Sequence, residues 1–227
     1  MASRYFASVL ICVTSLGCCA QSSAPEQQKG MPLILVLEKN MRGLKQPAGF
    51  VFNKGALCNN VVTPKSALSS LDSALYYAQK QGVKATLYGG VVNFDDGNNE
   101  EEQKELAFVI PRFAPPPATM NGLGLLLDGM VTMEMDKPRS FIGGFTGGQE
   151  TQLRFPPQTN RTVRDNLDAI VKLDGKGMWV MTPPQKSTDG KGLSHRATID
   201  IVDYETNTPP NAINCETAAT EAERVSH

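Results

Sequence analysis

The sequence predicts an α+β fold, a mainly antiparallel β-sheet with one packed amphipathic helix. Short apolar runs of strand length recur along the chain, and 20 glycines and 15 prolines supply many turns between them. Only residues 64–81 combine clear helical spacing with start and stop signals. Hydrophobic residues make up 41% of the 227, which is enough for a core. A β-sandwich with one helix is the alternative.

The first half of the fold, residues 31–114, is predicted as strand, helix, strand. Residues 32–38 (PLILVLE) and 49–53 (GFVFN) are apolar runs of strand length. Residues 83–94 form the strand after the helix, with Gly89-Gly90 as a bulge or bend. This order is compatible with a crossover unit.

The helix between these strands has a start signal, a stop signal and one apolar face. Thr63 is predicted to cap it, Pro64 suits its first position, and Gly82 stops it. Its apolar face is formed at spacings of three and four by Leu68, Leu71, Leu75 and Ala78.

A polar turn over residues 95–102 leads into an ambiguous stretch. Residues 100–106 favour helix, whereas residues 107–110 favour strand. Pro111 and the three prolines at 115–117 then break any helix, so we place the boundary between two structural halves there.

The second half, residues 118–205, is predicted as an antiparallel meander. Residues 123–127 and 130–135 flank Asp128-Gly129, a hairpin signal. After a glycine-rich loop at 141–148, the expected strands are residues 151–155, 168–173, 177–182 and 193–204. Residues 206–227 are expected to form a polar tail.

The first twenty residues have the layout of a secretory signal. Arg4 supplies a positive charge, residues 6–16 are mostly apolar, and small residues follow at 17–20. One interpretation cuts the chain after Ala20, leaving residues 21–30 as a linker. The other resembles a lipoprotein signal ending at Cys18, which would carry lipid, although Ser15 stands where leucine is usual. A buried N-terminal helix is the third.

The cysteines are compatible with export. Of five cysteines, Cys58 and Cys215 remain beyond the leader, and one disulfide between them would close a loop of about 157 residues. The chain-entropy model gives about 4–5 kcal/mol for such a bridge. Two unrelated buried thiols are the alternative.

Charge limits the classes of partner. The chain has 22 Lys+Arg against 23 Asp+Glu, a formal net charge of -1, so no basic surface for nucleic acid is predicted. Beyond the leader no apolar run is long enough for a transmembrane helix, so the mature chain would meet a membrane only through a lipidated Cys18.

Catalytic signals are sparse. His195 is the candidate general base, but its neighbour Ser194 would face the other side of a strand. If Asp95, Asp96 or Asp200 lay near His195 in the fold, the acidic residue and the histidine would form the active site of a secreted hydrolase.

No metal or other cofactor is predicted. One interior histidine and no CxxC make a transition-metal site improbable. The acidic run could offer oxygen ligands to calcium, but its spacing does not fit the twelve-residue loop and suits a solvated helix start better. That run comprises Asp95, Asp96, Glu100, Glu101 and Glu102.

Two further features point to surfaces. Asn160 begins an Asn-Arg-Thr glycan acceptor triplet. Trp179 with Met178 and Met181 could form an apolar binding patch, although such residues more often fill a core.

From these observations we expect an exported, non-enzymatic binding or interaction protein whose partner is a protein or surface ligand. The alternatives are the secreted hydrolase and a lipid-anchored structural envelope protein. The sequence leaves the oligomeric state open.

Overall fold

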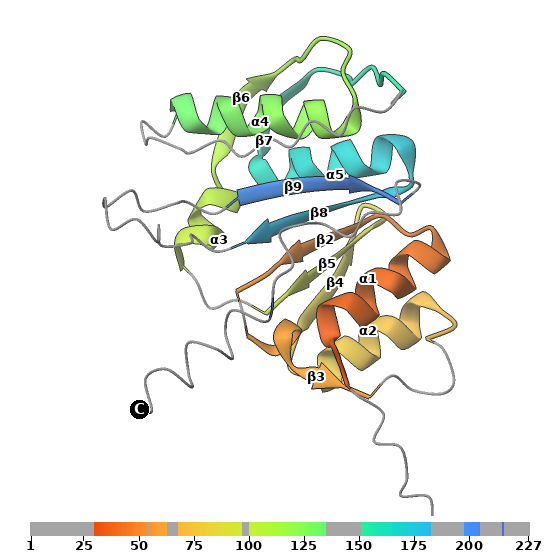
Figure 1. The fold of residues 1–227 in the computed structure, drawn as a ribbon. Helices are drawn as coiled ribbons and strands as arrows, with labels where there is room; N and C mark the ends of the chain where they lie inside the picture. Colours follow the sequence, from red (N-terminus) through yellow and green to blue (C-terminus); the bar gives the residue numbers. More distant parts are fainter. Residues whose placement is uncertain are drawn as a thin grey trace, which may run out of the picture.

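The computed structural model of the protein describes residues 30–53, 55–62, 68–96, 100–134, 151–182, 198–204 and 215. It confirms the α+β class, because helices and mixed sheets alternate along the described residues (Figure 1). Among these residues, no helix is both long and apolar enough to cross a membrane.

The centre of the fold is a five-stranded sheet with the order β4-β5-β2-β8-β9. Its three inner strands run parallel, and each edge strand is antiparallel to its neighbour. The strands are β2 (Ala48–Val51), β4 (Lys84–Tyr88), β5 (Val91–Asp95), β8 (Gly177–Thr182) and β9 (Thr198–Asp203).

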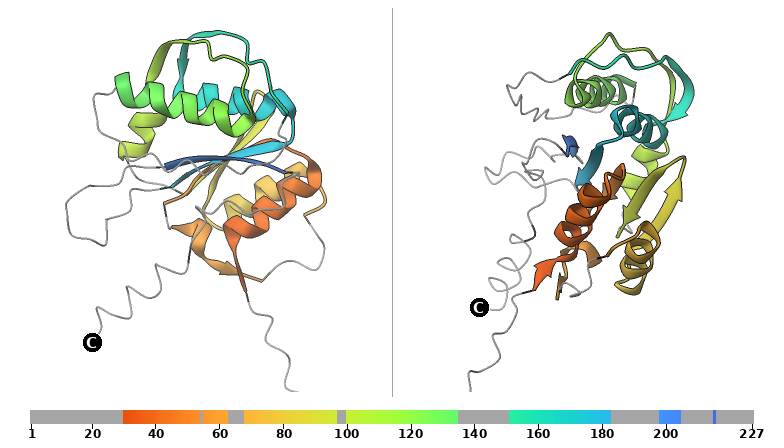
Figure 2. Two further views of the ribbon diagram at one scale, coloured as in Figure 1. Left: turned by 45° about the horizontal axis from the view of Figure 1, so that its top comes forward. Right: turned by 90° about the vertical axis from the view of Figure 1, so that its right-hand side faces the viewer.

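Helices cover both faces of this sheet, so the molecule has three layers (Figures 1 and 2). On one face lie α1 (Leu33–Leu44) and α2 (Leu71–Lys80), and on the other lie α4 (Met120–Glu134) and α5 (Val163–Asp174). The remaining elements are β1 (Met31–Pro32), η1 (Ala56–Cys58), β3 (Asn60–Val61), α3 (Glu100–Leu106), β6 (Val109–Phe113) and β7 (Gln158–Thr162). Strands β1 and β3 pair, as do β6 and β7.

The sheet separates two apolar cores. Under α1 and α2, Phe50 and Phe94 stack with ring centroids 5.0 Å apart. Under α4 and α5, Trp179 is fully buried among aliphatic side chains such as Leu167 and Ile170. Burial on both faces explains why the inner strands consist of nearly continuous apolar residues.

Residues 32–38 were expected to form a strand, and this expectation is wrong: Pro32 ends β1, and residues 33–38 form the first half of α1. A short apolar run has the same periodicity signal in a strand and in a buried helix. The helix is favoured because Leu33, Leu37 and Met41 lie at a spacing of four and are all fully buried on one face.

The hairpin predicted at Asp128-Gly129 is also wrong, because residues 120–134 form the single helix α4. Leu123, Leu127 and Val131 repeat at a spacing of four and are fully buried. Here the helical spacing of the leucines prevails over the local turn preference of Asp-Gly.

Residues 168–173, predicted as a meander strand, belong to α5 instead. Thr162 and Asp165 cap the start of α5 reciprocally, and Gly175 ends it in the left-handed conformation. Two later strands of the predicted half are confirmed: β8 matches residues 177–182, and it pairs antiparallel with β9. Residues 151–155 do not form the expected strand and hold only an isolated bridge at Leu153.

The predicted helix at 64–81 exists but begins later, as α2. Ser70, rather than Thr63, caps it through a reciprocal bond with Ser73, while residues 63–67 lie outside the described part. The single strand predicted at 83–94 is a hairpin, because Gly89 and Gly90 both have positive φ and form a two-residue turn.

The ambiguous stretch after residue 100 contains both predicted elements, α3 followed by β6. The division into halves at 31–114 and 118–205 stays a prediction. One sheet nevertheless draws strands from both ranges, because β2 pairs in parallel with β8.

Candidate functional site

The end of the parallel strands is the place where a ligand site is expected in this topology. After β2 the chain turns towards α2 on one face, and after β5 it turns towards α3 and α5 on the other. Neighbouring strands whose connections leave to opposite faces open a crevice at their carboxyl ends. Asp95 and Asp96 lie at this point, at the end of β5.

Asp96 bonds to the loop that follows β2. One carboxylate oxygen accepts the backbone N–H of Asn53 at 2.8 Å, and the other accepts those of Gly55 and Leu57 at 3.0 Å each. Burial raises the pKa of Asp96, while these three hydrogen bonds favour its charged form and oppose the rise. The carboxylate therefore holds the loop after β2 in place.

Asp95 projects to the α5 side and is paired there. Its Oδ2 accepts Gln103 Nε2 at 2.7 Å and lies 3.5 Å from a guanidinium nitrogen of Arg164. The amide oxygen of Gln103 accepts from Arg164 at 3.3 Å. These three side chains link β5, α3 and α5 in a closed polar triangle.

A shallow hollow lies beside this triangle. Its volume is about 420 Å³, and it is lined by Glu100, Gln103, Lys104 and Ala107 of the α3 region. Lys104 and Glu100 are separated by 3.8 Å but are both largely exposed. A small molecule could rest here, although a hollow so open to solvent would hold it only loosely.

A second polar cluster lies deep between α5 and the sheet. Asp168 Oδ1 accepts Trp179 Nε1 at 2.7 Å, and its Oδ2 accepts Asn93 Nδ2 at 3.0 Å. Burial raises the pKa of Asp168, partly opposed by these two hydrogen bonds. The indole ring crosses directly over Gly49 of β2, where a Cβ would lie 2.2 Å from the ring. The cluster thus ties α5 to β5 and β8.

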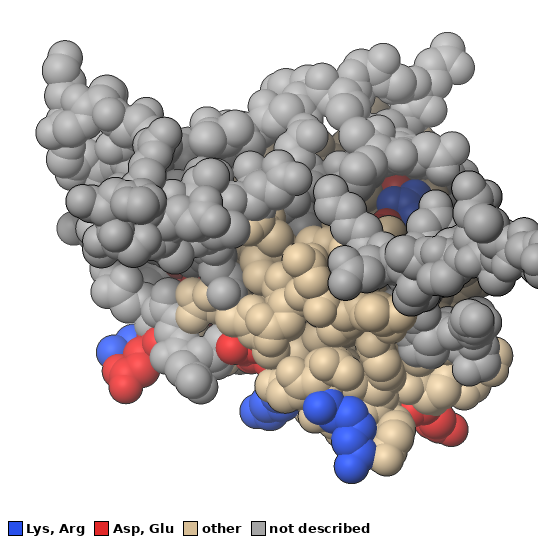
Figure 3. Space-filling model, turned by 60° about the horizontal axis from the view of Figure 1, so that its bottom comes forward, with Lys and Arg blue, Asp and Glu red and all other residues tan. Residues whose placement is uncertain are grey.

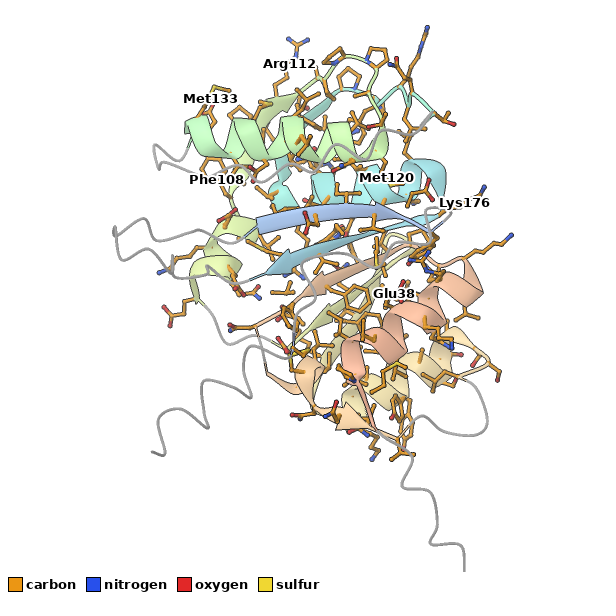
Figure 4. The ribbon with its side chains drawn as sticks, viewed as in Figure 1. Glu38, Phe108, Arg112, Met120, Met133 and Lys176 are labelled. Atoms are coloured by element: carbon orange, nitrogen blue, oxygen red, sulfur yellow. A yellow bond between two sulfur atoms is a disulfide. The ribbon has the colours of Figure 1, made fainter. Side chains whose placement is uncertain are left out.

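A third cluster joins α1 to the end of β9. Arg42 contacts Glu38 Oε1 through its Nε at 2.8 Å and donates to the carbonyl of Tyr204 at 2.5 Å (Glu38 is labelled in Figure 4). The hydroxyl of Tyr204 donates to the carbonyl of Gln46 at 2.7 Å. Burial, with Glu38 nearby, raises the pKa of Tyr204. Glu38, Arg42 and Tyr204 therefore stabilise the fold by linking α1 to the end of β9.

The predicted acidic and catalytic residues do not all meet. Asp200 lies on edge strand β9, separated from Asp95 on β5 by strands β8 and β2. Burial raises the pKa of Asp200. His195, Cys18 and the side chain of Glu101 lie outside the described part of the chain. Within that part, no three His, Cys, Asp or Glu side chains are placed to hold a metal.

Of the predicted modifications, the disulfide is present in the structure, and glycosylation of Asn160 stays a prediction. Cys58 and Cys215 form a disulfide with their Cα atoms 5.4 Å apart, which fastens residue 215 to the core under α1 and α2. Asn160 is exposed on β7 and has a φ of +50°. It lies opposite Pro111 of β6, and the β6–β7 pairing omits these two residues. Its side chain is therefore accessible.

The predicted apolar patch around Trp179 is buried, since Met178, Trp179 and Met181 have no exposed surface. Exposed apolar side chains occur elsewhere, on β4, where Leu87 is 51% and Tyr88 66% exposed. The sequence pattern does not reveal them, because it predicts residues 83–94 as one strand, whereas they form an edge hairpin.

Surface charge is mixed where it can be seen. On the face at the bottom of Figure 1, acidic and basic side chains both lie around a central area of uncharged residues (Figure 3). This agrees with a formal net charge of -1 and indicates no strong field of one sign on the described part of that face.

Comparisons with known proteins give no match: no family model fits the chain, and neither a curated protein nor a solved structure is significantly similar.

Proposed function

We propose that the protein is exported and acts outside the cytosol as a non-enzymatic binding protein. The observation that carries the proposal is the Cys58–Cys215 disulfide. Disulfides persist in oxidising compartments and are rare in the reducing cytosol. The leader-like pattern of residues 1–20 independently supports the same location.

Binding is favoured over catalysis by how three carboxylates around the central sheet are used. Asp96 accepts three backbone N–H groups, Asp95 is paired with Arg164, and Asp168 accepts from two side chains. A general base needs a lone pair directed at a substrate. These carboxylates direct theirs at the protein's own donors, so they stabilise the fold.

The surface offers apolar area for contact instead. Leu87 and Tyr88 on β4, and Met133 on α4, are each at least half exposed, with Met133 labelled at the end of its helix in Figure 4. Aromatic and methionine side chains are enriched at protein interfaces. A protein ligand would cover such residues and remove them from water.

The test is fractionation of cells that produce the full chain or a variant lacking residues 2–20. Export predicts that the full chain is found outside the cytosol with Cys58 and Cys215 oxidised, while the shortened chain stays inside. Finding both chains in the cytosol would contradict the proposal. If the full chain is found in the membrane fraction, and a variant without Cys18 is not, the result would instead indicate the lipid-anchored form.

A further inference from the structure

Strand β4 is an open edge of the central sheet. It pairs with β5 on one side, and among the described residues no strand pairs with its other side. The β4–β5 hairpin stands at the margin of the molecule in the right-hand view of Figure 2. Lys84, Thr86, Leu87 and Tyr88 are all exposed, and only Ala85 is buried. An unpaired edge strand is a template for another strand.

The register determines which backbone groups of β4 face outwards. Leu87 lies opposite Val92, whose N–H donates away from β4 to the carbonyl of Pro47 at 3.0 Å. In an antiparallel pair both residues then point their groups away from each other. The N–H and carbonyl of Leu87 therefore face the open edge.

Ala85, two residues earlier, has the same orientation. Its carbonyl accepts the side-chain amide of Gln79 on α2 at 3.3 Å, which places that oxygen on the outer side. By the same alternation, the backbone groups of Thr86 point inwards to Asn93 of β5. The open edge thus presents two residues, Ala85 and Leu87, placed symmetrically about Thr86.

We propose that this edge binds the β4 edge of a second copy of the chain, antiparallel, about a two-fold axis at Thr86. This identification of the partner rests on the proposed binding function. Ala85 of each copy exchanges both backbone hydrogen bonds with Leu87 of the other, giving four bonds. The Ala85 carbonyl has two lone pairs, so it accepts the new bond through the one that Gln79 does not use. The two central sheets become one continuous sheet.

The side chains of β4 match one another in this register. On one face, Ala85 lies opposite Leu87 of the other copy, so a small residue meets a large one. On the opposite face, the Lys84 cation lies opposite the ring of Tyr88, and cations are attracted to the faces of aromatic rings. The two Lys84 residues are four positions apart along the ladder, about 13 Å, so they do not repel strongly.

Cysteine cross-linking tests the register. Thr86 residues of the two copies would face each other as a non-hydrogen-bonded pair with Cβ atoms about 4.5–5.5 Å apart, close to disulfide geometry. Thr86→Cys, in the exported protein with its native disulfide intact, is expected to form a covalent dimer on mild oxidation. Lys84→Cys is the matched control on the same exposed strand, and it is expected to stay uncrosslinked.

Sedimentation of the unmodified protein over a wide concentration range tests the association itself. Leu87→Pro removes an outward N–H for which the described residues supply no partner. It therefore spares the β4–β5 pairing and is expected to weaken the dimer by about tenfold or more. Leu87→Lys is expected to act likewise. Val109→Lys on β6 is the control, because Val109 is 49% exposed and Leu87 is 51% exposed.

A monomer at every concentration would overturn the inference, as would equal cross-linking of both cysteine variants or a dimer that Leu87→Pro and Leu87→Lys leave intact. None of these results bears on export or on the native disulfide, which fractionation measures separately. The two proposals can therefore fail independently.

Discussion

Replacing Gly49 with alanine is expected to destabilise the protein strongly because of the ring that lies over it. A Cβ at this position would lie 2.2 Å from Cε2 and 2.3 Å from Cζ2 of Trp179. Carbon atoms pack at about 3.5–4.0 Å, so the ring or strand β2 would have to move by more than 1 Å. Trp179 is fully buried, and close-packed protein interiors leave little space for a ring to move into.

The magnitude follows from two costs. Overpacking a core costs about 1–3 kcal/mol. Moving the ring also strains or breaks the 2.7 Å hydrogen bond from Trp179 Nε1 to Asp168, and a hydrogen bond to a charged group contributes about 1.5–3 kcal/mol. We therefore expect Gly49→Ala to lower the free energy of unfolding by about 3–5 kcal/mol.

Gly43→Ala is the matched control. Gly43 lies in α1, and nothing would come within 4 Å of its Cβ. Alanine is the better helix former by about 0.8–1.0 kcal/mol, so this variant should be slightly more stable than the unmodified protein. The same substitution thus has opposite effects at the two positions.

Urea unfolding of the oxidised protein is the assay, followed by far-ultraviolet circular dichroism, because one of the two backgrounds compared lacks the single tryptophan, Trp179. In a Trp179→Leu background, where the smaller side chain removes the clash, Gly49→Ala should cost much less. A Gly49→Ala loss below about 1 kcal/mol, or a loss equal in both backgrounds, would refute the reasoning.

Three other variants test separate parts of the fold. Cys58→Ser should lose about 4–5 kcal/mol in urea unfolding and become insensitive to reductant, and an unchanged midpoint would mean that the Cys58–Cys215 bridge is absent in solution. Asp96→Ala leaves three backbone N–H groups without their acceptor and should lower the free energy of unfolding by about 2–3 kcal/mol. The control, Asp72→Ala in the first turn of α2, should lower it by at most about 1 kcal/mol. Equal losses would contradict the assigned role of Asp96. Because burial raises the pKa of Asp200, its contribution to stability is complete below the ordinary carboxyl pKa and is lost as pH rises through the higher folded value. Asp200→Asn should therefore exceed the unmodified protein in stability at neutral pH and match it in acid, and a gap that does not narrow on acidification would count against a buried, charged Asp200.

The fold class and several elements could be predicted because local signals agreed with the tertiary environment. Residues 177–182 became β8, with a turn before it at Gly175. The errors at 32–38, 123–135 and 168–173 share a physical cause. In each, apolar residues at a spacing of four were mixed with additional apolar residues, as expected for a helix packed in a three-layer fold. Short windows of such sequence resemble buried strands.

The candidate site was harder to predict than the fold. The Asp95-Asp96 pair was identified from its charge, but the direction of each carboxylate depends on which face of β5 it occupies. Nothing in the sequence around Asp168 indicates that it accepts from Trp179 and Asn93, which are 11 and 75 positions away. Such clusters arise from parallel strand order, and parallel order cannot be read from local patterns.

The central claim is that this is an exported protein closed by one disulfide. Its most direct test is the intact mass of the native product after exposure to a thiol-alkylating reagent. We predict a chain beginning at Gln21 that takes up no alkyl group until it is reduced, when Cys58 and Cys215 both react. A product that retains its first twenty residues and is alkylated at both cysteines without reduction would contradict the account.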